Sequence, residues 1–140
     1  MPKPIENVAC HCLQFRRSTA NVIEFYDRKL APSGVSIRQY SLLKAIGNNQ
    51  GCNVRQLGEV TVLDRSTLAR TLKPLIRQGL VINDKAPGAR DSRLVLSPRG
   101  ETVRQQAADL WAQAQTEFEQ VLGTKRLAAL EDALLALQAL

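Results

Sequence analysis

Apolar residues recur every three or four positions over residues 7–30, which is the spacing of one stripe along an amphipathic helix. Pro32 and Gly34 follow and are typical of a helix end. We therefore predict a long N-terminal helix with a single apolar face. The stripe consists of Val8, Cys12, Phe15, Thr19, Val22 and Tyr26.

Three helix starts follow this first helix. Ser36 and Asn53 are each followed three residues later by glutamine, a capping-box pattern in which two side chains satisfy two otherwise unpaired backbone amides. Asp64 is a good N-cap for a third helix, which Gly79 closes, although Pro74 inside it predicts a bend or a loosened turn. The residues expected to face inward are Ile37, Tyr40, Leu43 and Ile46, then Leu57 and Val60, then Leu68, Leu72, Leu75 and Ile76.

The second half of the chain begins with two short β-prone runs, residues 80–83 and 93–96. The charged segment between them contains Pro-Gly, so we expect a hairpin with a long tip. Ser97 followed by proline starts a long helix that Gly123 ends, and Thr124 caps a last, leucine-rich helix. The fold class that results is mainly α with one small β-hairpin.

Length and composition place the chain among globular proteins of one domain, since 140 residues with 44% hydrophobic and 23% charged content suit neither disorder nor a membrane span. The first residues lack the apolar block of a secretory signal, and the odd number of cysteines does not suit a disulfide framework. We expect a cytoplasmic protein with reduced thiols and no membrane partner.

Positive charge is concentrated in the front and middle of the chain, within a net charge of +6. Residues 53–104 carry ten Lys and Arg against five Asp and Glu, whereas residues 105–140 carry two against five. A basic surface suits a polyanion, because Lys and Arg that neutralise phosphates release condensed counterions. A solvated basic face without a partner is the alternative.

Residues 53–79 hold two helices joined by a tight turn, the arrangement of a helix-turn-helix. In that motif the second helix enters the major groove of DNA. With Leu68 and Leu72 buried, helical geometry turns a basic and hydroxylic set of side chains outward, which suits base edges and phosphates. A helix end that is basic by chance is the competing interpretation. The candidate DNA-binding residues on this helix are Arg65, Ser66, Thr67, Arg70 and Lys73.

The predicted hairpin adds a second candidate element. Arg90, Asp91 and Arg93 lie at its tip and shoulder. A loop beside a recognition helix can place an arginine in the adjacent minor groove. Two separate elements therefore point to DNA.

The chain resembles the MarR (multiple-antibiotic-resistance regulator) family of dimeric winged-helix transcription factors over nearly its whole length. The resemblance implies that Arg93 is the minor-groove arginine with Asp91 as its supporting carboxylate, and that Ser66, Thr67 and Arg70 face the operator. The matching stretches are residues 30–34, 39–40, 63–68, 73–75, 78–81 and 91–100, the last reading Asp-Ser-Arg-Leu-Val-Leu-Ser-Pro-Arg-Gly.

The resemblance also implies a domain plan within residues 1–140. A winged-helix DNA-binding lobe spans residues 33–100, and residues 1–32 and 101–140 supply dimerisation helices. The leucine-rich C-terminus supports this independently, because exposed apolar stripes mark interfaces. A two-fold homodimer reads a near-palindromic operator with half-sites about 34 Å apart. We expect a repressor released by an effector.

The effector can be an oxidant or a small aromatic molecule. Cys12 lies near a helix start with Arg16 one turn on, an environment that favours the thiolate. By the resemblance, Cys12 and Tyr26 align with the sensing cysteine and one partnering tyrosine of the hydroperoxide-responsive branch, whereas the second tyrosine position holds Ile37. The alternative is that Cys12 is a small apolar residue of the stripe. Tyr26, Tyr40, Phe15 and Trp111 are candidates to line an aromatic-ligand pocket.

Other chemistry finds little support in the residues. Cys10-His11-Cys12 falls short of the paired spacings of zinc sites, and Cys52 is a bystander or a resolving thiol. One histidine, scattered carboxylates and the absence of hydrolase, P-loop and zincin motifs argue against an enzyme and against a cofactor. A protein-binding adaptor with a basic face is the remaining rival.

Overall fold

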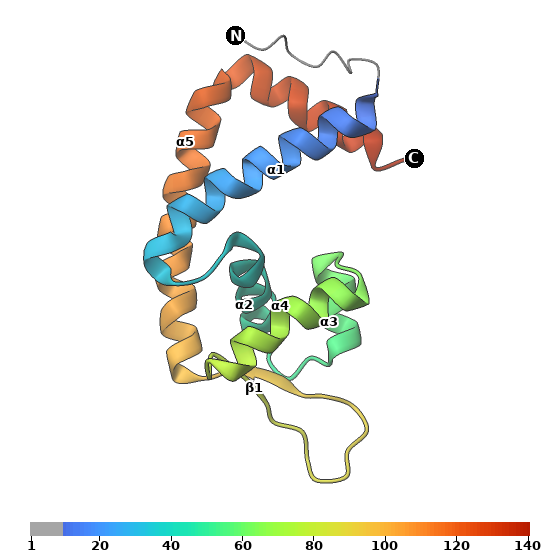
Figure 1. The fold of residues 1–140 in the computed structure, drawn as a ribbon, viewed down its shortest axis with the longest axis vertical. Coiled ribbons are helices and arrows are strands. Elements are labelled where there is room, and N and C mark those ends of the chain that lie inside the picture. Colours follow the sequence, from blue (N-terminus) through green and yellow to red (C-terminus); the bar gives the residue numbers. More distant parts are fainter. Residues whose placement is uncertain (1–9) are drawn as a thin grey trace, which may run out of the picture.

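The computed structural model describes residues 10–140. Figure 1 shows a lobe at one end, formed by α2–α4 and a hairpin, and an arm at the other, formed by α1 and the later part of α5. Within residues 10–140, none of the helices combines the length and the apolarity that crossing a membrane needs. The elements are α1 (His11–Leu30), the short 3-10 helix η1 (Ala31–Ser33), α2 (Ile37–Asn48), α3 (Val54–Thr61), α4 (Arg65–Arg77), β1 (Val81–Asn83), β2 (Leu94–Leu96) and α5 (Pro98–Leu137).

The predicted N-caps set the starts of four helices. The side chains of Ser36 and Asn53 each accept a hydrogen bond from the backbone N–H of the glutamine three residues on. Each glutamine side-chain oxygen accepts one from the N-cap backbone N–H, so both capping boxes are confirmed. Asp64 caps α4 and Ser97 caps α5 in the same way with one side-chain acceptor. The helix predicted from residue 7 begins at His11, and residues 7–9, with Val8, lie outside the described part.

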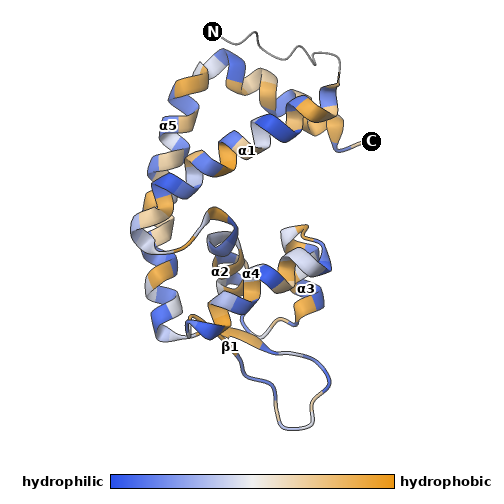
Figure 2. Cartoon of the chain, viewed as in Figure 1, coloured by the Kyte–Doolittle hydropathy of each residue, from blue (hydrophilic) through white to orange (hydrophobic). Residues whose placement is uncertain are grey.

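The core of the lobe is built around α2, whose Leu42, Leu43 and Ile46 are fully buried. Leu57 of α3 and Leu75 of α4 pack into the same cluster, and Figure 2 marks the apolar positions along these helices. Burying such side chains stabilises the fold by about 1.5–3 kcal/mol each. The inward placement predicted for Val60 and Ile76 is wrong.

Val60 is 58% exposed and Ile76 is 40% exposed. Val60 lies at the rim of two surface pockets between α2 and α3, where no further element covers it. Ile76 lies in the last turn of α4, directly after the buried Leu75. Helix α4 continues through Pro74 to Arg77 without a break.

The hairpin pairs β1 with β2 in antiparallel register, with Val81 opposite Leu96 and Asn83 opposite Leu94. A segment that the sequence did not reveal as a strand joins it: the Leu94 N–H donates to the Cys52 carbonyl at 2.8 Å, and the Gly51 N–H donates to the Leu94 carbonyl at 2.7 Å. This bridge fastens the hairpin to the loop that precedes α3.

Helix α5 changes direction at Gly123, where φ is 77° and ψ is 161°. The predicted break is therefore confirmed, although the two segments form one continuous element, and Figure 1 shows the turn near the top of the view. Glycine adopts this positive φ without the steric penalty of a side chain. Beyond the turn Leu134, Leu135 and Leu137 are exposed.

The arm is joined to α5 by contacts near the end of α1. Tyr26 donates a hydrogen bond to the Gln115 amide oxygen and packs against Phe25 and Phe118. Lys29 pairs with Glu117 at 2.5 Å. The N-terminal part of α1 lacks such cover in the single chain, since Cys12, Phe15 and Val22 are exposed.

Candidate nucleic-acid interface

Helix α4 presents the residues that the sequence analysis singled out. It buries Leu68, Leu72 and Leu75 against the lobe. The opposite face carries Arg65, Ser66, Arg70 and Lys73, all exposed, and Thr67, which is half-buried. A row of cationic and hydroxylic side chains along one accessible helix face suits both base edges and phosphates.

The first turn of α4 is organised by the Asp64 carboxylate. Its Oδ1 accepts from the Thr67 N–H at 2.8 Å and from the Ser66 hydroxyl at 2.9 Å, and its Oδ2 accepts from the Thr67 hydroxyl at 2.9 Å. Arg70 in turn donates to Thr67 Oγ1 at 3.3 Å. The Thr67 N–H, and then the two hydroxyls, lower the pKa of Asp64 to about 2, so this carboxylate is ionised at neutral pH.

The wing (residues 81–96) shows that the carboxylate partner predicted for Arg93 is wrong. Arg93 does not use Asp91 as its carboxylate partner: its Nη1 lies 2.6 Å from Asp84 Oδ2. The Asn83 side chain accepts from the Arg93 N–H at 3.0 Å, which ties the same residue to the end of β1. The physical reason is the antiparallel pairing, which brings residues 83 and 84 across from Arg93.

A groove of about 770 Å³ lies between α3, the start of α4 and the wing. Three arginines line it, namely Arg55 of α3, Arg65 of α4 and Arg90 of the wing, together with the carboxylates of Glu59 and Asp91. Arg55 was missed by the sequence analysis. Its place as the second residue of the first helix of the helix-turn-helix, two positions after the N-cap Asn53, was the signal that could have revealed it.

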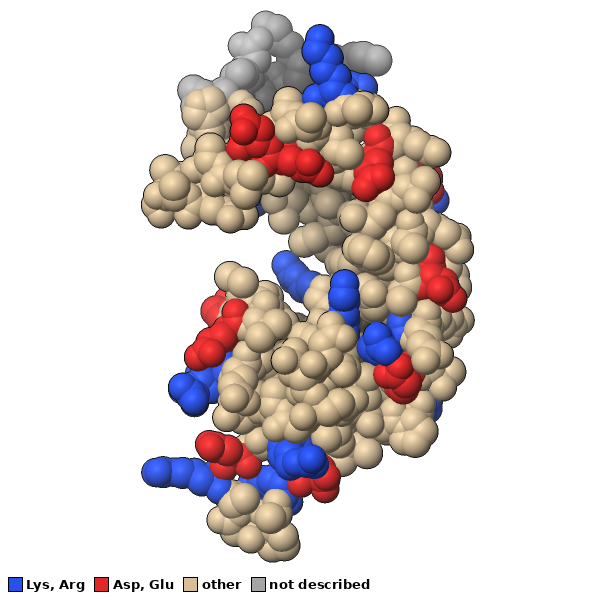
Figure 3. Space-filling model, turned by 180° about the vertical axis from the view of Figure 1, so that it is seen from behind, with Lys and Arg blue, Asp and Glu red and all other residues tan. Residues whose placement is uncertain are grey.

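The wing is anchored so that it stays beside α3 and α4. Ser92 Oγ accepts from the Val54 N–H at 2.9 Å, which joins the wing to the first amide of α3. Together with the Cys52–Leu94 bridge, this contact sets the position of Arg90 and Arg93 relative to α4. In Figure 3 basic side chains stand at the end of the molecule that carries the wing, interspersed with acidic ones, and acidic side chains are also prominent at the arm.

The two residues of the predicted redox pair are not brought together within one chain. Cys12 and Tyr26 are fourteen residues apart on the continuous helix α1, a separation of about 21 Å along its axis. Cys12 is exposed, and the Tyr26 hydroxyl is bonded to Gln115. Burial and the nearby Glu119 raise the pKa of the Tyr26 hydroxyl.

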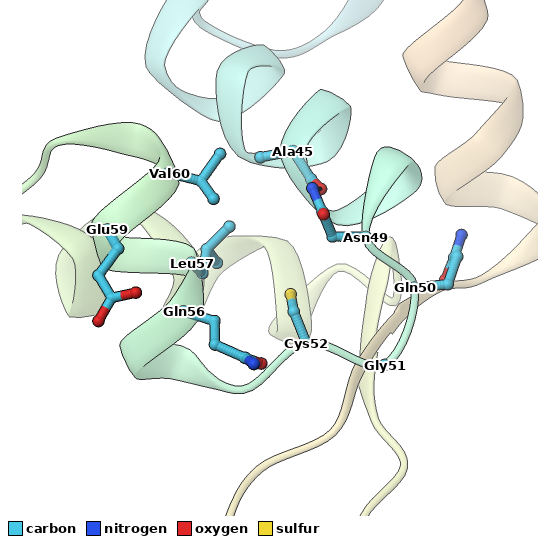
Figure 4. A pocket seen from close by; sticks show the side chains of 9 residues that line it. All are labelled: Ala45, Asn49, Gln50, Gly51, Cys52, Gln56, Leu57, Glu59 and Val60. Atoms are coloured by element: carbon cyan, nitrogen blue, oxygen red, sulfur yellow. Dashed lines mark hydrogen bonds between the residues drawn. The ribbon is translucent and has the colours of Figure 1, made fainter.

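Cys52 lies elsewhere, in a pocket of about 480 Å³ on the lobe, between the end of α2 and α3. Figure 4 shows its thiol pointing toward Leu57 and Ala45, with Gln56 and Glu59 at the rim. Burial raises the pKa of the Cys52 thiol, which disfavours the reactive thiolate. Cys10 is the N-cap residue of α1 and Cys12 lies in its first turn, so both are remote in sequence from this pocket.

The candidate effector residues form separate groups. Tyr40 of α2 and Trp111 of α5 face each other with ring centroids 6.3 Å apart, and Lys44 Nζ lies 4.9 Å from the Trp111 ring centroid. Tyr26 belongs to the aromatic cluster of the arm, and Phe15 is exposed nearer the start of α1. The four aromatic residues therefore do not line one shared cavity in the single chain.

A helix-turn-helix formed by α3 and α4, with a hairpin beside it, defines a winged-helix protein. Residues 33–94 match the family model described as the MarR family. The chain is 31% identical to the transcriptional regulator MosR of M. tuberculosis in a complex with DNA, covering 93% of this chain and 96% of that one with a TM-score of 0.77. The chain belongs to the MarR family of transcription regulators.

Two other similarities agree with this assignment. The regulator SarZ of Staphylococcus epidermidis is 29% identical over 108 residues, which cover 76% of this chain and 73% of that protein. The structure of Bordetella bronchiseptica BpsR, described with regulation of its DNA binding by 6-hydroxynicotinic acid, superposes with a TM-score of 0.85. It covers 99% of this chain and 100% of that one at 15% identity, which shows a shared fold.

Proposed function

We propose that this transcription regulator binds double-stranded DNA with α4 in the major groove and the wing over the adjacent minor groove. The observation that carries the proposal is the exposed face of α4, with Arg65, Arg70 and Lys73 beside a wing that holds Arg90 and Arg93. Arg70 is assigned to base edges and Arg93 to the minor groove. The similar regulator MosR, solved in a complex with DNA, supports DNA as the partner.

The arginines that line the groove between α3 and the wing are assigned to the phosphate backbone. Arg55, Arg65 and Arg90 come from three elements. The hydrogen bond from the Val54 N–H to Ser92 holds the wing beside α3, so that the arginines line one groove. Phosphate contacts of this kind set the register of a protein on the duplex without reading sequence.

We infer that the regulator acts as a homodimer. Phe15 and Val22 on α1 are exposed, as are Leu134, Leu135 and Leu137 after Gly123 on α5, and Figure 2 shows apolar residues along both segments. A second copy that covers these faces removes the apolar surface from water and places two α4 helices on one side of the dimer. The operator is then near-palindromic, and the lobe (residues 33–100) acts as the reading unit between dimerisation segments (residues 1–32 and 101–140).

The proposed biological role is that of a repressor that a small aromatic acid releases from DNA. Lys44 lies over the Trp111 ring, which the buried Tyr40 supports from within the lobe, so a cation and an aromatic ring lie together where α2 packs against α5. BpsR, whose DNA binding is regulated by 6-hydroxynicotinic acid, supports an aromatic acid as the class of effector. Release by oxidation at Cys12 stays a prediction, since Tyr26 lies about 21 Å from Cys12 along α1 within one chain.

Selection of bound duplexes from genomic fragments tests the proposed function. The recovered sites are expected to share two inverted half-sites about 34 Å apart, and the logarithm of the affinity is expected to fall linearly with the logarithm of the salt concentration. A scrambled duplex of equal length is the control. Equal binding of the selected and scrambled duplexes would favour a basic adaptor instead.

Tryptophan fluorescence tests the effector, because Trp111 is the single tryptophan of the chain. Titration with 6-hydroxynicotinate is expected to change the emission and to release the duplex, and Lys44→Ala is expected to weaken both effects about tenfold because a charged hydrogen-bond donor is lost. Cyclohexanecarboxylate, an anion without an aromatic ring, is the matched control. Unchanged emission together with an unaffected complex would contradict this effector class.

A further inference from the structure

The hydroxyl groups at the start of α4 are already engaged within the protein. Ser66 Oγ donates its proton to Asp64 Oδ1 at 2.9 Å, and Thr67 Oγ1 donates to Asp64 Oδ2 at 2.9 Å. A hydroxyl has one proton to donate and two lone pairs that accept. Both side chains have therefore given away the only donor with which they could contact a base.

The two hydroxyls differ in what remains available to DNA. Thr67 Oγ1 also accepts from Arg70 Nη2 at 3.3 Å, so its second contact is made within the helix and its methyl group is left for an outside partner. Ser66 is exposed and keeps its lone pairs free. The low pKa of Asp64 means that this carboxylate accepts from both hydroxyls and does not itself supply a proton at neutral pH.

We propose that Asp64 sets the base preference of α4 by fixing Ser66 as an acceptor and Thr67 as an apolar contact. The inference rests on the proposed insertion of α4 into the major groove. There the amino groups of adenine and cytosine are the donors that an acceptor selects, and the thymine methyl is the apolar group. Asp64 is thus a positioning residue that acts through its neighbours.

The same network orients the arginine. Thr67 holds one nitrogen of the Arg70 guanidinium, which leaves the other N–H groups directed away from Thr67 and available for a guanine edge. The chain of contacts from Asp64 through Thr67 to Arg70 spans the first two turns of α4. A change at Asp64 therefore reaches three candidate base contacts without removing any of them.

Asp64→Asn is the informative variant. The amide oxygen keeps the N-cap contact with the Thr67 N–H, while the NH2 group replaces Oδ2 and donates to Thr67 Oγ1. The Thr67 hydroxyl proton is then free to point into the groove. At the base pair that faces Thr67, we expect the preference to shift about tenfold toward guanine, which presents two acceptors.

Binding to duplexes with each half-site position varied in turn measures the effect. Thr67→Val, which keeps the methyl group, is expected to leave the preference for thymine at its position, whereas Ser66→Ala is expected to lose the preference for an amino group at its own. Ser36→Ala removes the N-cap of α2 and is the matched control for lost helix stability, with wild-type base preferences expected.

Each outcome decides the proposal. In Asp64→Asn, a shift confined to the position that Thr67 faces supports it, because Ser66 still donates to the oxygen at the Oδ1 position. Wild-type preferences at every position in that variant overturn it even if overall affinity falls. Should Asp64→Asn fail to fold, Thr67→Val decides, because a lost thymine preference in that variant overturns the assignment. If the wild-type chain binds no duplex, the proposed function fails and this inference fails with it. If the wild-type chain binds selectively and Asp64→Asn has the same base preferences, the inference alone fails.

Discussion

Arg70→Ala is expected to lower the affinity for the selected operator about 100-fold or more while leaving the dimer intact. A bidentate contact from arginine to guanine is worth about 1–3 kcal/mol of discrimination, and a dimer loses it twice. The Arg70 side chain is exposed and packs into no core, so the fold does not depend on it. Binding isotherms with operator and scrambled duplexes, together with sedimentation of the free protein, measure the two expectations.

Arg70→Lys is the matched control, since it keeps the charge and removes the planar fork that makes two parallel hydrogen bonds. We expect it to share most of the loss of selectivity and to retain the salt dependence of the parent. If Arg70→Lys binds the operator as well as the parent does, Arg70 contributes charge alone and the assignment to a base edge is wrong.

Gly100→Ala is expected to lower the free energy of unfolding by about 3 kcal/mol, because the added methyl group has no room. A Cβ at Gly100 would lie 2.0 Å from the Leu80 carbonyl oxygen, which belongs to the backbone and cannot swing aside. The start of α5 is held against this carbonyl by Ser97, whose hydroxyl donates to the Gly79 carbonyl at 2.5 Å and whose N–H donates to Leu80 at 3.1 Å.

Urea unfolding at a fixed protomer concentration measures the change, because dimer stability depends on concentration. Gly58→Ala is the matched control: its Cβ would lie 3.5 Å from the nearest Leu68 methyl, which is ordinary contact, and alanine in a helix interior is favoured over glycine by about 0.5–1 kcal/mol. Equal stabilities of the Gly100→Ala and Gly58→Ala variants would contradict the close approach of α5 to Leu80.

Local chemistry made the helix boundaries and the hairpin predictable. Ser36, Asn53, Asp64 and Ser97 each satisfy amides within three residues of themselves, so their effect on the chain is readable in a short window of sequence. The turn at Gly123 was predictable for the same reason, since only the local backbone requires glycine there. The exposed face of α4 followed from helical periodicity alone.

Contacts between distant segments were not predictable in this way. Asp84 and Arg93 meet because two strands pair, and Cys52 joins Leu94 across more than forty residues of chain. The convergence of Arg55 with Arg90 likewise needs the packing of α3 against the wing. Val60 has the spacing of a core residue, yet its exposure is decided by which element covers α3.

Methylation interference on the selected operator tests the central claim most directly, because it reports which groove each base contact uses. Methyl groups at guanine N7 lie in the major groove, and those at adenine N3 lie in the minor groove. The account predicts interference at guanine N7 in two half-sites about 34 Å apart, loss of that pattern in Arg70→Ala, and interference at adenine N3 in the flanking segments near Arg93. Selective binding that tolerates guanine N7 methylation throughout both half-sites would contradict the placement of α4 in the major groove.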